Sequence, residues 1–163
     1  MTPIAADTGP LIALARVGRL HLLRRLYRQV VIPPAVHGEL AIGSGRPGAT
    51  ALADTLAAGW ISVQLVADHQ AVLQLGQDLD LGEAEAIALA EQLDARFLLI
   101  DEAAGRRIAR RRGVPVTGVA SVLLSAKASG AVVAVGPIIE ELSSAGYRLS
   151  SRLVSSVLER AGE

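Results

Sequence analysis

The chain has 163 residues, 51% of them hydrophobic, and its 16 lysine and arginine residues balance 16 aspartate and glutamate residues. This composition excludes a disordered chain and a protein that coats nucleic acid through its overall charge, and the length fits one domain over residues 1–163. The absence of cysteine excludes disulfides and thiolate metal sites. No apolar run approaches the ~20 residues of a membrane span and no secretory signal opens the chain, so we expect a cytoplasmic protein without membrane contact.

Short apolar runs alternate with helical patterns along the first half of the chain. The order is strand 4–6, helices 11–15 and 20–27, strand 30–32, a helix from Pro33-Pro34 to Leu40, a glycine-rich loop 43–48, helix 49–58 and strand 60–66. The last of these strands is predicted from apolar residues at the alternate positions 61, 63 and 65.

The second half continues the same alternation. The order is helices 68–75 and 83–93, strand 97–100, helix 102–111, strand 114–116, helix 119–128 ended by Gly130, and helices 137–144 and 150–160. Strands separated by helices predict right-handed βαβ units, and hence an α/β protein whose parallel sheet is covered on both faces.

Four acidic residues from distant segments are the main candidates for chemistry. Asp7 ends the apolar run 4–6, and Asp101 ends the apolar run 97–100. Glu39 follows the strand at 30–32 by less than two helical turns, and Glu83 opens the helix that leads to Asp101. Ligands of α/β sheets bind beyond the carboxyl ends of the strands, so we expect the four carboxylates to meet in one cleft. They would repel one another unless they shared a cation such as Mg²⁺ or Mn²⁺, which prefers oxygen ligands.

Each of these acids also has a purely structural interpretation. Asp7 could be a turn residue or a helix cap, Asp101 a first-turn acid favoured by the helix dipole, and Glu39 a solvated helix residue. The hydroxyl of Thr8 could bind a carboxylate or a metal-ligating water, or could cap the helix that follows.

Glu83 and Glu85 compete for the third acidic position, because residues two apart on a helix point to different faces. The helix face that contains Glu83 continues with Ile87 and Ala90 and is the more apolar of the two, which favours Glu83 as the inward residue. Asp80 and Glu102 are further acids nearby, which we interpret as solvated.

Basic residues follow the Asp101 strand on one helix. Arg106 and Arg107 are nearest the acids and are candidates for binding substrate phosphate, with a solvated helix face as the alternative. For Arg110, Arg111 and Arg112, the solvated face is the preferred interpretation.

Several segments together resemble the PIN-domain family. The stretch ADTGPLIAL at 6–14 resembles the opening of these proteins, and VIPPAVHGEL at 31–40 resembles their second acidic segment. LGEAEAIALA at 81–90 and LLIDE at 98–102 are similar to the third and fourth segments of one uncharacterised bacterial and archaeal PIN subfamily, as is the tail from GVPVTG at 113–118 to Ala126-Lys127.

The resemblance implies a three-layer α/β/α PIN-like fold with a central, mostly parallel sheet. It implies Mg²⁺- or Mn²⁺-dependent ribonuclease chemistry, with Asp7, Glu39, Glu83 and Asp101 as the catalytic and metal-binding residues. Many relatives are VapC-like toxins of toxin–antitoxin pairs, which implies a homodimer held inactive by an antitoxin protein.

Our leading hypothesis is therefore a metal-dependent endoribonuclease acting on RNA, with Thr8, Arg106 and Arg107 as substrate-binding residues. The alternative is a catalytically inactive PIN-fold module that binds RNA or a protein, because Val119 and Ser121 stand where this subfamily has Thr and Gly. A haloacid-dehalogenase-like phosphatase ranks last, because that chemistry requires a second Asp where this chain has Gly9.

Overall fold

A computed structural model describes residues 2–163 and confirms the α/β class. Five parallel strands form one sheet in the order β3-β2-β1-β4-β5. The strands are β1 (Ile4–Ala6), β2 (Val30–Ile32), β3 (Ile61–Val63), β4 (Leu98–Leu99) and β5 (Val116–Thr117). The central strand β1 pairs with β2 on one side and β4 on the other, where Ala5 lies opposite Val31 and Leu98 respectively.

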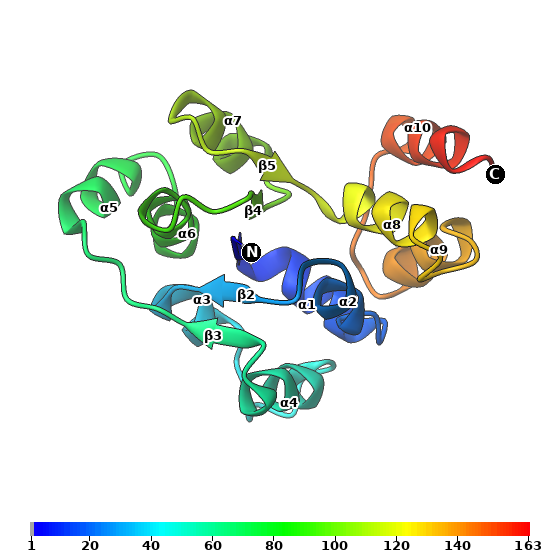
Figure 1. Cartoon of the computed structure of the whole chain (residues 1–163), viewed down its shortest axis with the longest axis horizontal. Coiled ribbons are helices and arrows are strands. Elements are labelled where there is room, and N and C mark those ends of the chain that lie inside the picture. The colour runs from blue at the N-terminus through cyan, green and yellow to red at the C-terminus, as the bar shows by residue number, and fades with distance from the viewer. Residues whose placement is uncertain (1) are drawn as a thin grey trace.

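Helices cover both faces of the sheet, which gives the three-layer α/β/α arrangement that the sequence predicted (Figure 1). The helices are α1 (Thr8–Arg16), α2 (His21–Tyr27), α3 (Pro34–Glu39), α4 (Ala49–Ala58), α5 (His69–Leu75), α6 (Leu81–Gln92), α7 (Ala103–Arg111), α8 (Val119–Ala128), α9 (Gly136–Ser144) and α10 (Ser151–Ala161). One layer contains α3, α5 and α6, and the other contains α1, α2, α4 and α8. At the far side of the second layer, α9 packs on α1 and α10 packs on α8.

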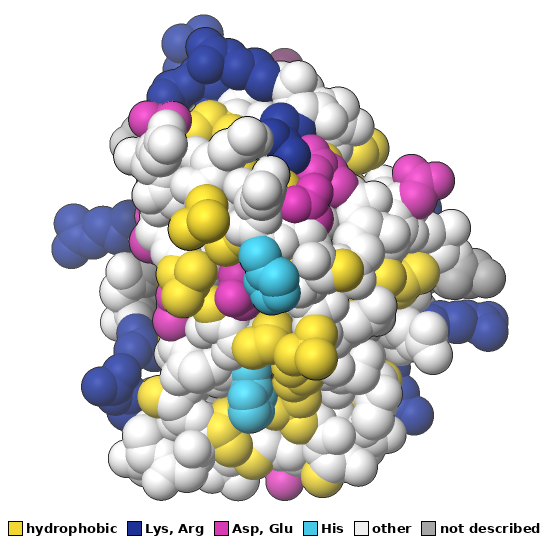
Figure 2. Space-filling model, turned by 90° about the vertical axis from the view of Figure 1, so that its left-hand side faces the viewer, with side chains coloured by type: hydrophobic (Ala, Val, Ile, Leu, Met, Phe, Trp, Pro, Cys, Tyr) yellow, Lys and Arg dark blue, Asp and Glu magenta, His cyan; other side chains and the backbone are white. Residues whose placement is uncertain are grey.

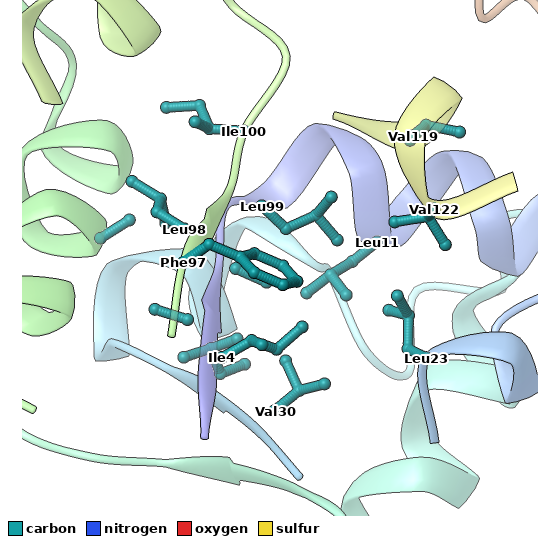
Figure 3. Packing of buried hydrophobic residues seen from close by; sticks show 14 of the residues in the cluster. Ile4, Leu11, Leu23, Val30, Phe97, Leu98, Leu99, Ile100, Val119 and Val122 are labelled. Carbon is teal, nitrogen blue, oxygen red and sulfur yellow. The ribbon is translucent and has the colours of Figure 1, made fainter. Parts of the chain in front are cut away.

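The core lies between the sheet and its helices. Strand residues are buried on both faces, as expected for a parallel sheet, and β1, β2 and β4 have no exposed residue. Figure 3 shows Leu99, Leu11 and Val122 meeting where the sheet faces α1 and α8. The ring of Phe97 packs edge-on against Tyr27, with centroids 5.0 Å apart.

Three predicted strands differ from the observed ones. The strand predicted at 97–100 is observed over Leu98–Leu99. The strand predicted at 60–66 pairs only over Ile61–Val63, and Val63 and Leu65 are 42% and 75% exposed. Because β3 is an edge strand, apolar alternation there does not imply burial. The strand predicted at 114–116 pairs over Val116–Thr117, because Pro115 has no N–H and contributes only its carbonyl, which accepts from Leu98.

The connectivity places a ligand-binding crevice at the centre of the sheet. From β1 the chain moves outward through β2 to β3, then returns to the other side of β1 to form β4 and β5. The order reverses between β1 and β4, and crevices of α/β sheets open at such switch points, beyond the carboxyl ends of the strands. Asp7 and Asp101 follow these two strands directly.

The face of α3, α5 and α6 carries a group of hydrophobic side chains beside histidines (Figure 2). The large hydrophobic residues exposed near this face are Val63, Leu65, Leu73 and Leu81. Of the helices that the structure describes, none has the length and apolar character needed to cross a membrane.

Candidate active site

One small cavity brings the four predicted acids together. It has a volume of about 180 Å³ and is lined by Asp7, Thr8, Gly9, Pro10, Glu39, Asp80, Glu83, Asp101, Glu102 and Tyr147. Larger hollows of about 750 and 380 Å³ lie elsewhere on the surface and contain none of the four acids. The spatial convergence expected from the sequence is therefore present in the folded chain.

Asp7 lies at the carboxyl end of β1, between the sheet and the cavity. Its backbone N–H donates to the carbonyl of Leu99 over 2.9 Å, which ties it to β4, and the residue is only 6% exposed. Asp7 occupies the N-cap position of α1, but its side chain makes no capping hydrogen bond there. Burial raises the pKa of Asp7 to about 7, and the nearby charges of Glu83, Asp80 and Glu39 add to the rise, against a backbone hydrogen bond from Thr8 that lowers it.

Asp101 lies just beyond β4, one strand away from Asp7. The backbone N–H of Val119 donates to its two carboxylate oxygens over 3.3 and 3.5 Å, at the beginning of α8. Burial raises the pKa of Asp101 to about 6, while the Val119 N–H and the charge of Arg106 act in the opposite direction. Asp101 is therefore held in place by the Val119 N–H while its pKa stays above the ordinary value.

Glu83 both caps the beginning of α6 and lines the cavity. The Asp80 carboxylate accepts from the Glu83 N–H over 2.8 Å, and Glu83 Oε2 accepts from the Asp80 N–H over 3.2 Å, which is a capping box at the beginning of α6. Glu83 is 8% exposed, and burial, with the charge of Asp80, raises its pKa. The Asp-x-x-Glu spacing is a sequence signal that could have identified the role of Asp80 as a cap.

The competing residue Glu85 points elsewhere. Its Oε2 accepts from the backbone N–H of Ala35 over 2.9 Å and so satisfies a free donor at the beginning of α3. Glu83 lines the cavity and Glu85 does not.

Glu39 reaches the cavity from the last residue of α3. Thr8 Oγ1, at the beginning of α1, donates to Glu39 Oε2 over 2.5 Å. Of the roles considered for Thr8, hydrogen bonding to a carboxylate is the one observed, and it links two segments that are 31 residues apart.

Three glycines stand directly behind three of the four acids. A Cβ at position 82 would lie 2.5 Å from Glu39 Oε1, and one at position 118 would collide with Asp101 Oδ1. A Cβ at Gly105 would lie 3.5 Å from Glu83 Oε1. None of these glycines has a left-handed backbone conformation, so the requirement at these positions is space for the carboxylates and for Ile100, whose Cδ1 would lie 2.6 Å from a Cβ at Gly105.

Neither of the two predicted substrate-binding arginines is in the cavity lining. Arg106 donates to the carbonyl of Ile100 over 2.8 Å, and Arg107 is exposed on α7. Further along the chain, Arg112 pairs with Glu91 over 2.6 Å, in agreement with a structural role. A role for Arg106 and Arg107 in binding substrate stays a prediction.

The cavity suits a hard divalent cation by the chemistry of its donors, which are all oxygen atoms. Within the part of the chain that the structure describes, no three Asp, Glu, His or Cys side chains have a geometry that would hold an ion. Instead, Glu39, Glu83 and Asp101 each accept a hydrogen bond from a nearby donor. The raised pKa values of Asp7, Glu83 and Asp101 indicate negative charge that the protein itself does not compensate.

Sequence reasoning missed Tyr147 and the three glycines. Tyr147 lies between α9 and α10, far along the chain from the acids, and no local pattern points to it. Gly82 and Gly118 each adjoin a recognised segment, but the need for space behind a carboxylate becomes visible only in three dimensions.

Comparison with protein families matches residues 3–163 to the family DUF3368, described as a PIN domain. No curated protein and no solved structure matches the chain. The family match covers every segment that lines the cavity.

Proposed function

This chain belongs to the PIN-domain family, and from that premise we propose that it is a Mg²⁺- or Mn²⁺-dependent endoribonuclease. PIN domains are typically nucleases that use divalent metal ions. The observation that carries the proposal is the convergence of Asp7, Glu39, Glu83 and Asp101, from four separate segments, on one cavity at the switch point of the sheet.

In this proposal all four carboxylates bind the cation. Asp7 and Asp101 follow the ends of adjacent strands, while Glu39 and Glu83 approach from α3 and α6. A bound divalent cation supplies positive charge that activates water and stabilises the charge developing on phosphate oxygens. The chain's own part is to orient these carboxylates and hold them close together, and the charge of a bound cation would favour their deprotonated form.

The surrounding residues orient the acids. Thr8 holds Glu39 by its hydroxyl, the Val119 N–H holds Asp101, and the capping box holds Glu83. In this proposal a phosphodiester group of the RNA substrate enters the cavity of about 180 Å³.

The test is RNA cleavage by the purified chain with Mn²⁺, compared with Asp101→Asn. We expect the loss of this ligand to reduce the single-turnover rate by roughly a hundredfold or more. Asp78→Asn is the matched control, because Asp78 is exposed and lies outside the cavity lining. Cleavage that persists in Asp101→Asn at the wild-type rate would refute the proposal.

A catalytically inactive binding module is the second candidate. It is favoured by the lack, among the described residues, of a preformed ion-holding geometry. Calorimetric titration with Mn²⁺ separates the two functions. An enzyme should bind Mn²⁺, with a lower affinity in Asp7→Asn, whereas the inactive module does not need to bind the cation.

The proposed partners are an antitoxin protein and a second copy of the chain. The exposed hydrophobic residues Val63, Leu65, Leu73 and Leu81 support a protein-binding surface on this molecule, since large exposed apolar groups commonly mark such sites. Sedimentation velocity of the purified chain tests the homodimer.

A further inference from the structure

Two adjoining hollows lie at the amino ends of β2 and β3. Their volumes are about 380 and 370 Å³, and Arg24, Ala58 and Trp60 line both of them. Trp60 directly precedes β3, and its carbonyl accepts from the N–H of Val30, the first residue of β2, over 2.9 Å. Because the strands are parallel, this edge of the sheet is opposite to the edge that carries the four acids. The two hollows are therefore separate from the candidate active site.

The smaller hollow is basic. Arg24, Arg28 and Gln29 line it, and no carboxylate does. The Arg28 N–H donates to the carbonyl of Arg24 over 3.0 Å, which places the two arginines one helical turn apart at the end of α2. Both are exposed, and neither forms an ion pair within residues 2–163. Two long cationic side chains can therefore reach the same anion at this hollow.

Arg28 has a strained backbone. Its φ is 69° and its ψ is −49°, and the Gln29 N–H donates across it to the carbonyl of Tyr27 over 2.8 Å. This is the rare γ-turn with positive φ, which glycine adopts without strain. The helix dipole favours basic residues near the end of α2, but it does not require one in a strained conformation. Strained residues persist mainly where function uses them, so the backbone points to a binding role for Arg28.

The larger hollow is mainly apolar. Leu20, Ala51 and Trp60 contribute to its lining, and its volume lies within the range of about 300–1,000 Å³ that is usual for small-molecule sites. His21 and Asp54, both exposed, line this hollow but not the basic one. A nucleobase suits such a lining, because its faces make apolar contacts while its edge groups hydrogen-bond to polar side chains.

We propose that the two hollows together bind a ribonucleoside monophosphate, either free or as the terminal nucleotide of an RNA strand. The phosphate lies between Arg24 and Arg28, and the base lies in the apolar hollow beside Trp60. Guanidinium groups donate paired hydrogen bonds to phosphate oxygens, which makes arginine the suitable residue for this contact. The site goes beyond the proposed ribonuclease function and does not depend on it.

The test uses the fluorescence of Trp60, which is the only tryptophan of the chain and therefore reports on this site. The full chain is titrated with AMP in EDTA, and calorimetry provides an independent Kd. We expect a Kd below about 1 mM for AMP, with weaker binding of adenosine and of inorganic phosphate. Arg28→Gly should raise the Kd about tenfold, because it removes a charged hydrogen-bond donor. Its Tm should equal or exceed that of the wild type, because glycine relieves the strain.

Arg25→Gln is the matched control, because Arg25 is exposed on the same helix and lines neither hollow. It should keep the wild-type Kd, whereas Arg24→Gln should weaken binding as Arg28→Gly does. The inference is overturned if the wild type does not bind millimolar AMP, or if Arg28→Gly and Arg25→Gln have equal Kd values. Inorganic phosphate that binds as tightly as AMP also overturns it, because the apolar hollow would then contribute nothing.

A competition experiment identifies the source of the nucleotide. An RNA oligonucleotide with a 5′-phosphate that displaces AMP, when its 5′-hydroxyl counterpart does not, supports the terminal nucleotide of a strand. If neither oligonucleotide displaces AMP, the result supports the free nucleotide. A wild-type chain that binds AMP but does not cleave RNA refutes only the ribonuclease proposal, and one that cleaves RNA without binding AMP refutes only this inference.

Discussion

Two carboxylate environments in this molecule behave in opposite ways. Glu163 accepts from the backbone N–H groups of Val135 and Gly136 over 2.8 and 3.0 Å and from Lys127 over 2.9 Å, and these donors lower its pKa to about 2. Asp7 is buried and Asp101 is half-buried, both with few donors, and the removal of their carboxylates from water raises their pKa values to about 7 and about 6. The chain can therefore compensate a carboxylate fully, and it does so at a joint between α8, α9 and α10 but not at the cavity.

The difference in hydrogen-bond donors indicates that Glu163 contributes to stability, whereas Asp7 and Asp101 are candidates for function. A carboxylate with a complete set of donors strengthens the fold, whereas buried carboxylates without donors weaken it until a cation or proton arrives. Residues that lower stability in the free protein while lining a cavity are candidates for binding and catalysis.

The largest effect on stability is expected from Asp7→Asn. The pKa of Asp7 rises from 3.8 to about 7 on folding, so the folded state holds the proton more tightly and the free protein loses stability as pH rises between these values. At pH 8 the variant should be more stable than the metal-free wild type by roughly 2 to 4 kcal/mol, and at pH 4 the two should converge. Urea unfolding with EDTA at both pH values measures this, and a wild type that gains stability with rising pH would contradict it.

Glu163→Gln should have the opposite sign. The folded pKa of Glu163 lies below its ordinary value of 4.5, so its contribution is present above that pH and is lost as pH falls toward 2. We expect the variant to have a lower Tm than the wild type at pH 7 and the same stability at pH 2. Glu159→Gln, an exposed glutamate on α10, is the control, and equal losses in both variants would remove the special role of Glu163.

Gly82→Ala should weaken cation binding much more than it changes stability. The new Cβ would displace the Glu39 carboxylate, which is the flexible end of a side chain, so we expect Mn²⁺ affinity to fall about tenfold. Stability should change by less than about 1 kcal/mol, because the helix gains an alanine. Gly38→Ala is the matched control, since a Cβ there would contact nothing. Equal Mn²⁺ affinity in both variants would show that the space behind Glu39 is not needed.

Glu85→Gln should have the smallest effect. An amide oxygen can still accept from the Ala35 N–H, so we expect a loss of about 0.5 kcal/mol in unfolding free energy and an unchanged rate of RNA cleavage. Glu83→Gln, in the same helix, is the comparison and should reduce cleavage strongly. Equal cleavage rates in the two variants would remove Glu83 from the proposed site.

The sequence predicted the fold well where local and global signals agree. Helices α4 and α8 begin and end at the predicted residues, and β1 and β2 do as well, because strand runs and turn signals are unambiguous there. The strand predicted at 60–66 was too long. The alternation of apolar residues extends to Leu65, but Leu65 lies beyond the end of the edge strand β3 and is exposed, so the pattern alone does not show where pairing stops.

For the site, the convergence of the four acids followed from the rule that ligands bind at the carboxyl ends of strands, and the PIN-domain family is confirmed by the family match. The choice of Glu83 over Glu85 for the cavity agrees with the geometry, although its role in catalysis stays a prediction. Tyr147, Gly82 and Gly118 could not be found, because their relation to the acids depends on packing between segments that are distant in sequence.

The capping box at Asp80 and Glu83 has a wider consequence. One carboxylate oxygen of Glu83 is occupied in starting α6, and the other faces the side of Gly105. The same two side chains therefore determine where α6 begins and how the Glu83 carboxylate is oriented, so a substitution that changes one of these properties also changes the other. A substitution at Asp80 that would look like routine surface variation in another protein would here alter the direction of a functional group.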